Sequence, residues 1–267
     1  MQLIDSHCHL DRLDLSREPE GIEGPLRRAR EAGVTGMLCV GIDLESWPAM
    51  RALVDERPEI WASVGVHPTS TGGREPTVAE LVGLARDPKV VAIGETGLDY
   101  YRLEGDPEWQ RERFRTHIAA SRETGLPLVV HTRAARADTL AVLRGAGAET
   151  GVFHCFTEDW EMARQGLDLG FYVSFSGIVT FRNARDIQEV ARRVPLERLL
   201  IETDSPWLAP APMRGKPNEP AHVRHVARFL AGLRGISVEA LAEATSANFF
   251  RLFAAAATAP AETASGA

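Results

Sequence analysis

Two histidines stand one residue apart near the start of the chain, in the segment DSHCHLD at residues 5–11. Because alternate side chains of an extended strand share a face, we expect His7 and His9 to point the same way and Cys8 to point to the opposite side. Imidazole nitrogens are frequent ligands of zinc and of other transition metals. The spacing therefore predicts a metal site to which other parts of the chain must bring further ligands.

Six further ionisable residues lie near the ends of short apolar segments. They are His67 in GVHP, Glu95 in GETG, His131 in VVHT, His154 in FHCF, and Glu202 and Asp204 in ETDSP. Taken singly, each has an ordinary structural explanation, such as a hydrogen-bonded core histidine or a carboxylate in an ion pair. Taken together they are hard to explain as packing, because buried ionised groups are costly unless they are paired or bound to metal. The group predicts a metal-dependent site.

The number of candidate ligands indicates two metal ions. A single catalytic zinc ion usually takes three protein ligands and keeps one position open. We expect Glu95 to bridge two divalent ions, with the remaining ligands divided between them: His7, His9 and Asp204 on one side, and His131 and His154 on the other. This mixed nitrogen and oxygen set suits Zn, Mn or Fe, and the carboxylates leave Mg open.

These residues need a scaffold that gathers strand ends. Apolar segments rich in β-branched residues alternate with amphipathic segments, which is typical of repeated βα units. The eight predicted strands are 2–9, 34–41, 60–67, 90–97, 127–132, 150–156, 171–177 and 199–205. The predicted helices are 22–32, 44–56, 77–87, 107–124, 134–146, 159–169, 183–194, 221–234 and 238–253. This count predicts an α/β fold, a (β/α)8 TIM barrel, whose active sites lie where the strands end. A doubly wound sheet is the alternative, but no Gly-rich turn follows the first strand.

Composition bounds the remaining possibilities. We expect one domain over residues 1–253 and a disordered tail over 254–267, whose sequence AAAATAPAETASGA is small and aperiodic. The formal net charge of −7 argues against broad adhesion to nucleic acid, although bound cations can reverse the local sign. The three cysteines and the absence of a signal or membrane-spanning segment predict a cytoplasmic protein, and no amphipathic segment demands a partner, so a monomer is expected.

Seven segments in order resemble the TatD family of metal-dependent deoxyribonucleases. They are DSHCHLD, GVHP, IGETGLDYYR, PLVVHTR, HCFT, LIETDSPWLAP and RGKPNEPAHV, and the resemblance runs from about residue 2 to residue 253. It implies a TIM barrel with a divalent metal centre whose ligands are His7, His9, Glu95, His131, His154 and Asp204. It also implies that Glu202 is an additional metal-binding or water-positioning carboxylate, and that His67 contacts phosphate or moves a proton without binding metal.

The resemblance implies hydrolysis of DNA phosphodiesters, commonly from the 3′ end, with links to DNA repair and DNA degradation. In this interpretation Asp204 holds the attacking water and acts as its base, and His67 serves the phosphate or the leaving oxygen. Single-stranded DNA would be gripped at the mouth by His67, Tyr101, Arg102, Arg133 and Trp207, with Tyr100, Arg182, Arg214 and Lys216 as further candidates, because rings interleaved with cations suit a single strand.

Two other function classes remain open at this point. An amidohydrolase-type enzyme for a small-molecule amide, lactone or phosphoester shares the early His-x-His and the late Asp. Many of its binuclear members bridge the ions with a carbamylated lysine on strand 4, where this chain has Glu95, and Lys89 precedes that strand. A non-catalytic nucleic-acid-binding barrel predicts lost ligands and a basic face, and the sequence has neither.

Overall fold

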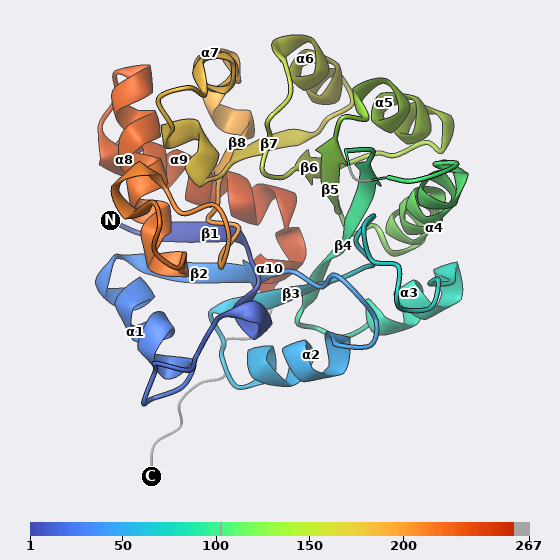
Figure 1. The fold of residues 1–267 in the computed structure, drawn as a ribbon, viewed down its shortest axis with the longest axis horizontal. Helices are drawn as coiled ribbons and strands as arrows, with labels where there is room; N and C mark the ends of the chain where they lie inside the picture. The colour runs from blue at the N-terminus through green and yellow to red at the C-terminus, as the bar shows by residue number, and fades with distance from the viewer. Residues whose placement is uncertain (102, 259–267) are drawn as a thin grey trace.

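A ring of parallel strands forms the centre of the protein, and helices surround it (Figure 1). The computed structural model describes residues 1–101 and 103–258. The sheet has eight strands in the order β1 to β8, each paired in parallel with the next. They are β1 (Leu3–Cys8), β2 (Val34–Cys39), β3 (Ile60–Val64), β4 (Val90–Asp99), β5 (Leu128–Arg133), β6 (Gly151–Phe153), β7 (Tyr172–Phe175) and β8 (Leu199–Ile201).

Backbone hydrogen bonds just beyond β8 bring the last strand against the first. The Asp204 N–H donates to the His7 carbonyl at 2.9 Å, and the His9 N–H donates to the Ser205 carbonyl at 2.8 Å. The predicted (β/α)8 TIM barrel is confirmed. The strands themselves are shorter than expected at β6 and β8, so His154, Glu202 and Asp204 lie in the connections that leave the strands.

Helices alternate with the strands as predicted, with ends that differ by a few residues. They are α1 (Glu23–Glu31), α2 (Trp47–Asp55), α3 (Val78–Leu84), α4 (Glu108–Thr124), α5 (Arg136–Gly145), α6 (Trp160–Asp168), α7 (Arg185–Arg193), α8 (Val223–Arg234), α9 (Val238–Leu252) and α10 (Ala254–Thr258). Local chemistry sets several of these ends. The Thr77 and Asp159 side chains cap α3 and α6 by accepting backbone N–H groups, and Gly125, at φ 72°, ends α4. Over residues 1–101 and 103–258, no helix has the length and apolar character needed to cross a bilayer.

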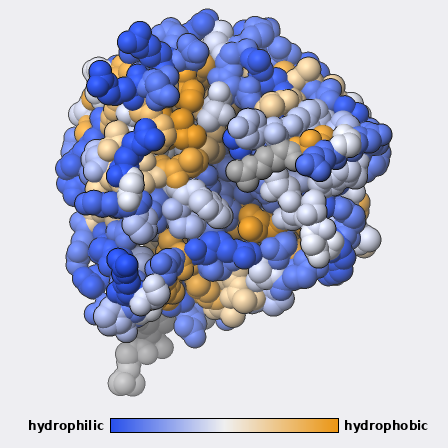
Figure 2. All heavy atoms as spheres, in the orientation of Figure 1, coloured by the Kyte–Doolittle hydropathy of each residue, from blue (hydrophilic) through white to orange (hydrophobic). Residues whose placement is uncertain are grey.

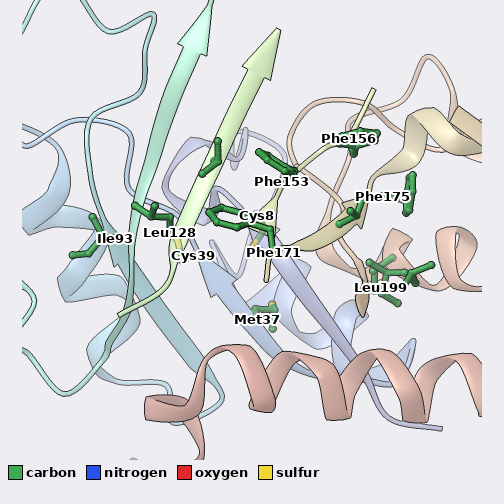
Figure 3. Close-up of a cluster of buried hydrophobic side chains, with 14 of the residues drawn as sticks. Cys8, Met37, Cys39, Ile93, Leu128, Phe153, Phe156, Phe171, Phe175 and Leu199 are labelled. Atoms are coloured by element: carbon green, nitrogen blue, oxygen red, sulfur yellow. The ribbon is translucent and has the colours of Figure 1, made fainter. Parts of the chain in front are cut away.

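Two apolar layers form the core. The outer layer lies between strands and surrounding helices, and Figure 3 shows Cys8 and Cys39 there with Leu128 and Phe153. Cys8 therefore points away from the barrel interior, as the strand alternation predicts. The inner layer fills the barrel interior at the amino ends of the strands. It includes Ile4, Leu38, Trp61, Val91, Val129, Val152, Tyr172 and Leu200.

The last two helices close the barrel at the end opposite the polar residues. Phe249 and Phe253 are fully buried and belong with Ala256 to the inner layer. The expectation of disorder is wrong for residues 254–258, which form α10. Ala256 packs against the inner apolar layer of the barrel, and the composition of the tail does not reveal this contact. Residues 259–267 of the predicted tail lie outside the described residues.

Candidate metal centre

The carboxyl ends of the strands surround a cavity of about 710 Å³. In Figure 2 the molecular face in this view is mostly hydrophilic, with hydrophobic residues gathered toward its centre. The residues that line the cavity include His9, His67, Glu95, Asp99, His131, Arg133, His154, Cys155, Ile178, Asp204, Trp207 and Leu208. The structure thus brings together at one mouth residues that are spread over most of the chain.

Glu95 lies at the centre of this group, and its two oxygens face different partners. Oε2 is 3.4 Å from His7 Nε2 and 3.7 Å from His9 Nε2. Oε1 is 2.7 Å from His154 Nε2 and 3.3 Å from His131 Nδ1. A carboxylate placed in this way can give one oxygen to each of two ions.

The first group of donors comes from β1 and from the connection after β8. His7 Nε2 and His9 Nε2 are 3.1 Å apart, and His9 Nε2 is 3.5 Å from Asp204 Oδ1. The other nitrogen of His9, Nδ1, lies 2.9 Å from the Val40 carbonyl, so it carries the proton. Nε2 of His9 therefore presents a lone pair to the centre, as a metal ligand must.

The second group contains His131, His154 and a carboxylate that the sequence analysis missed. Asp99 Oδ2 lies 3.1 Å from His131 Nε2, which leaves Nδ1 of that ring to face Glu95. A signal for Asp99 was present, because Glu95, Gly97 and Asp99 alternate along β4 and so share a face. Gly97 is also required there, since a Cβ at its φ of 129° would lie 2.0 Å from the His131 carbonyl oxygen.

Unpartnered polar atoms mark the centre as a ligand site. In the described part of the chain, eight buried side-chain nitrogen or oxygen atoms have no hydrogen-bond partner. Four of them are here: His7 Nδ1, both ring nitrogens of His154, and Glu202 Oε2. His154 Nε2 is close to Glu95 Oε1 yet is not aligned with it as a donor, which fits two ligands that face a common ion better than a hydrogen bond.

His67 lies beside these ligands, and it presents an N–H to Glu95 where they would present a lone pair. Its Nδ1 accepts the Thr69 backbone N–H at 3.1 Å, so in the neutral ring the proton is on Nε2. Nε2 lies 3.2 Å from Glu95 Oε1 and can donate to it. His67 can thus donate a hydrogen bond toward the centre, and one of its ring nitrogens also lies within 4.8 Å of atoms of Glu95 and His131, as ligands of a single ion would.

The electrostatics of the metal-free site follow from burial and from the central carboxylate. Burial disfavours the charge of Glu95, yet His154 and His67 hold the pKa of this carboxyl well below its usual value. Burial lowers the pKa of His7, with His154 adding to the effect. For His154, burial is outweighed by Glu95 and Glu202, which raise its pKa well above the ordinary value. Divalent cations bound to these nitrogens would replace the ring protons that balance the buried carboxylates in the metal-free site.

The backbone at the mouth is strained next to the candidate ligands. In the described ranges, the non-glycine residues with positive φ are Ala134, Cys155, Asp204 and Leu208. Ala134 follows the end of β5, Cys155 follows His154, Leu208 follows Trp207, and Asp204 itself has φ 55°. Strain of this kind clusters at active sites because the surrounding structure holds it for function.

Segments outside the strands support the ligand-bearing loops. The Val66 N–H donates to His117 Nε2 of α4 at 2.9 Å, and Arg113 Nη1 donates to the His67 carbonyl at 2.8 Å. On the other side, the Asn218 amide donates to the Thr203 carbonyl at 2.9 Å and also to that of Trp207. The buried Asn218 of the RGKPNEPAHV segment therefore fixes the connection that carries Asp204.

The predicted substrate contacts are distributed unevenly. Arg133 and Trp207 line the cavity, and the exposed Trp207 ring lies 5.1 Å from His9, edge to face. Tyr101 is exposed beneath the Arg133 guanidinium, 3.8 Å from the ring centroid. Tyr100 instead donates to Asp138 at 2.8 Å, away from the cavity. Arg182, Arg214 and Lys216 are exposed and do not line the cavity, and Arg102 lies outside the described residues.

Similar proteins cover nearly the whole chain. Residues 4–254 match the family described as TatD related DNase. The chain is 52% identical over 255 residues to the uncharacterized metal-dependent hydrolase YcfH of Escherichia coli (strain K12), covering 95% of this chain and 96% of that protein. It is 34% identical over 259 residues to the 3′-5′ ssDNA/RNA exonuclease TatD of Klebsiella pneumoniae (strain 342), covering 94% and 97%. The solved TatD homologue YJJV of Escherichia coli K12 is similar with a TM-score of 0.86 and 29% identity, covering 94% of this chain and 98% of that one.

Proposed function

This chain belongs to the TatD family of metal-dependent hydrolases, and we propose that it removes nucleotides from the 3′ end of single-stranded DNA. The observation that supports this best is Glu95, whose two oxygens face separate sets of imidazoles at the carboxyl ends of the barrel strands. The relative named as an exonuclease adds support for nucleic acid as the substrate. We take the protein to act as a cytoplasmic monomer, in DNA degradation or repair.

Two divalent ions, Mg, Mn or Zn, would be held by His7, His9, Asp204, Glu95, His131 and His154. When bound there, they supply an activated water and charge stabilisation for in-line displacement at phosphorus. Glu95 gives one oxygen to each set, so its negative charge is shared. The His9 Nδ1 hydrogen bond to Val40 keeps that ring in the ligating tautomer.

Asp204 is the proposed base for the attacking water. Its Oδ1 faces His9 and its side chain is partly exposed to the cavity, so one oxygen can hold a metal while the other accepts a proton. Hydrogen bonding and nearby histidines outweigh burial and lower the pKa of Asp204, so it is ionised at neutral pH. Burial lowers the pKa of His67, so the ring is neutral and would donate an Nε2–H hydrogen bond to a phosphate oxygen or the leaving oxygen without giving up its proton.

The terminal nucleotides would be held by aromatic and cationic groups at the mouth. Trp207 offers an exposed ring beside His9 on one side of the cavity. Arg133, stacked on Tyr101, offers a guanidinium to a phosphate. A base can stack on such rings whatever its identity, so this grip implies little sequence preference.

Metal-stripped protein incubated with 3′- and 5′-labelled single-stranded DNA tests the proposal, with Mg, Mn or Zn restored one at a time. The expected result is stepwise shortening from the 3′ end that requires metal and is lost in Glu95→Ala. Folded protein that binds two ions and cuts no nucleic acid with any metal would reject the nuclease assignment. The remaining candidate would then be a small-molecule amide, lactone or phosphoester, which fits the apolar wall formed by Ile178 and Leu208.

A further inference from the structure

We propose that Glu202 is a positioning residue that accepts hydrogen bonds from the Nδ1–H groups of both His7 and His154. By holding both protons on Nδ1, it keeps Nε2 of each ring free to bind an ion, so one carboxylate serves both metal positions. The inference rests on the proposed metal centre and assigns Glu202 no contact with substrate.

The two histidine rings are stacked against each other. Their centroids are 3.9 Å apart and their planes differ by 10°. Nε2 of each ring faces Glu95, at 3.4 Å for His7 and 2.7 Å for His154. Nδ1 of each ring therefore lies on the side of its ring away from Glu95, and both Nδ1 atoms are buried without a partner.

Glu202 lies on the Nδ1 side of the His154 ring. Its Oε1 is 3.4 Å from His154 Nδ1, and one donor atom from each of His7, His154 and Glu202 lies within 4.8 Å of the others. The three atoms His7 Nδ1, His154 Nδ1 and Glu202 Oε2 are all buried and have no partner in the metal-free site. Two unpaired donors and a carboxylate are complementary, and hydrogen bonds of this kind tighten once a site is loaded. Glu202 makes an ion-pair contact with His154 alone in the metal-free site, so the role requires His7 Nδ1 and Glu202 to approach each other when metal binds.

The chemistry of ligation supplies the reason for this arrangement. An imidazole that binds metal through Nε2 carries its remaining proton on Nδ1, and that N–H needs an acceptor when it is buried. His9 has the Val40 carbonyl and His131 has the analogous Asp99 contact at its other nitrogen. His7 and His154 are the ligands without such an acceptor unless Glu202 provides it.

The position of Glu202 suits a hydrogen-bond acceptor and does not suit contact with substrate. It is fully buried, it does not line the cavity, and its Oε1 is fixed by the Cys155 backbone N–H at 2.7 Å. A further ion bound by Glu202 together with either ring would require that ring, already bound to metal through Nε2, to lose its Nδ1 proton as well. Hydrogen bonding needs no such loss.

Zinc titration of metal-free wild type, Glu202→Gln and Glu158→Gln by calorimetry tests the role. Glu158 is a matched control because it is a nearby carboxylate paired with Arg136 at 3.2 Å and touches none of the ligands. Glutamine has one acceptor oxygen for the donors that Glu202 serves, so affinity should fall by about 10- to 100-fold for both ions in Glu202→Gln. Glu158→Gln should match wild type.

Three results separate the inference from the proposed function. Wild-type affinity at both positions in Glu202→Gln overturns the positioning role. A third ion in wild type that is missing from Glu202→Gln also overturns it, since Glu202 would then be a ligand. Failure of wild type to bind any ion rejects the metal centre itself.

Long-range ¹H–¹⁵N spectra of ¹⁵N-histidine-labelled, zinc-loaded protein give a readout that a purely structural role does not move. Three metal-bound rings should show protonated Nδ1, those of His7, His9 and His154, and His131 should show protonated Nε2. In Glu202→Gln two Nδ1–H signals should shift or exchange faster, while the His9 signal stays because its acceptor is Val40. If Glu202→Gln does not fold, the wild-type spectrum still tests the inference. A wild-type spectrum with a single Nδ1–H signal, that of His9, would overturn it.

Discussion

Asp99 Oδ2 lies 3.1 Å from Nε2 of His131, and Nδ1 of the same ring lies 3.3 Å from Glu95. The other Asp99 oxygen accepts the Tyr101 N–H at 3.0 Å, and the Asp99 backbone N–H donates to Gln110 at 2.9 Å. Both ends of this carboxylate are therefore fixed. His131 is thereby held as an Nδ1 ligand, although it comes from a strand end that is open to the cavity.

Asp99→Asn should weaken metal binding at the position served by His131 without unfolding the protein. An amide has a single carbonyl oxygen for the two donors that Asp99 now satisfies, and loss of an outer carboxylate costs about 10- to 100-fold in metal affinity or activity. Manganese titration followed by electron paramagnetic resonance measures this. Asp138→Asn, in the ion pair with Arg111, is the control, and equal affinities for the two variants would refute the role.

Glu95→Gln should cost more than any outer-sphere change. Its amide cannot bridge two cations, so the loss of activity should exceed the range of about 10- to 100-fold that outer partners produce. Metal content after dialysis and initial rates on a labelled oligonucleotide are the measurements. Two retained ions together with full activity would show that Glu95 is not the bridge.

Divalent ions should stabilise the native barrel. A ligand that binds only the folded state at one hundred times its Kd contributes about 2.7 kcal/mol, which is about 5–10 °C in Tm for a chain of this size. Thermal unfolding with and without Mn²⁺ after chelation measures the shift. Glu95→Gln should show little of it, and an equal shift in both proteins would place the stabilising ion elsewhere.

His117 should make stability depend on pH below the range in which the site works. Burial lowers its pKa from 6.5 to about 4 in the folded protein, where Nε2 accepts the Val66 N–H. Above pH 6.5 the ring is neutral in both states and its full contribution is present. Between pH 6.5 and 4 only the unfolded chain takes up the proton, so stability is lost as pH falls, by about 2–3 kcal/mol at pH 4.5.

The control for this prediction is the His117→Gln variant, because a glutamine side chain does not titrate. Urea unfolding of metal-free wild type and His117→Gln at pH 7 and pH 4.5 isolates its share, because the other groups titrate in both proteins. The stability difference between the two pH values should be smaller in the variant. Identical differences would mean that His117 is not held neutral by the fold.

Trp207 and Arg133 should contribute to DNA binding in different ways. Trp207→Ala removes a stacking ring and should weaken binding of single-stranded DNA by about 1–3 kcal/mol at any salt concentration. Arg133→Ala removes one phosphate contact and should reduce the slope of log affinity against log salt by about 1. Fluorescence anisotropy across a salt series, with catalysis blocked by metal removal, distinguishes the two contributions. Unchanged affinity and slope in both variants would exclude Trp207 and Arg133 as DNA contacts.

The barrel and the convergence of the six candidate ligands at its mouth were predictable because both depend on short-range patterns. Alternation along a strand placed His7 and His9 together, and the repetition of strand ends placed Glu95 and His154 near them. The roles of Asp99 and Glu202 were not predictable in the same way, since they depend on which ring nitrogen points where. Ring orientation follows from three-dimensional packing, such as the stack of His7 on His154, and leaves no periodicity in the sequence.

Helix α10 was missed for a related reason. An alanine run is compatible with both a helix and a disordered end. The contact of Ala256 with the inner apolar layer of the barrel favours the helix. His117 likewise reads as an ordinary helix residue until Val66 is placed against it.

The ligand set spans the first and last strands of the barrel, with His7 on β1 and Asp204 directly after β8. An ion held between them would join two points separated by nearly all of the barrel sequence. It would act as a reversible cross-link across the seam where the ring closes, and the loop that it constrains runs from His7 to Asp204, through all the strands of the barrel. Opening of the β1–β8 seam would then break ligand contacts on both sides of the ion, so a bound ion should slow that opening.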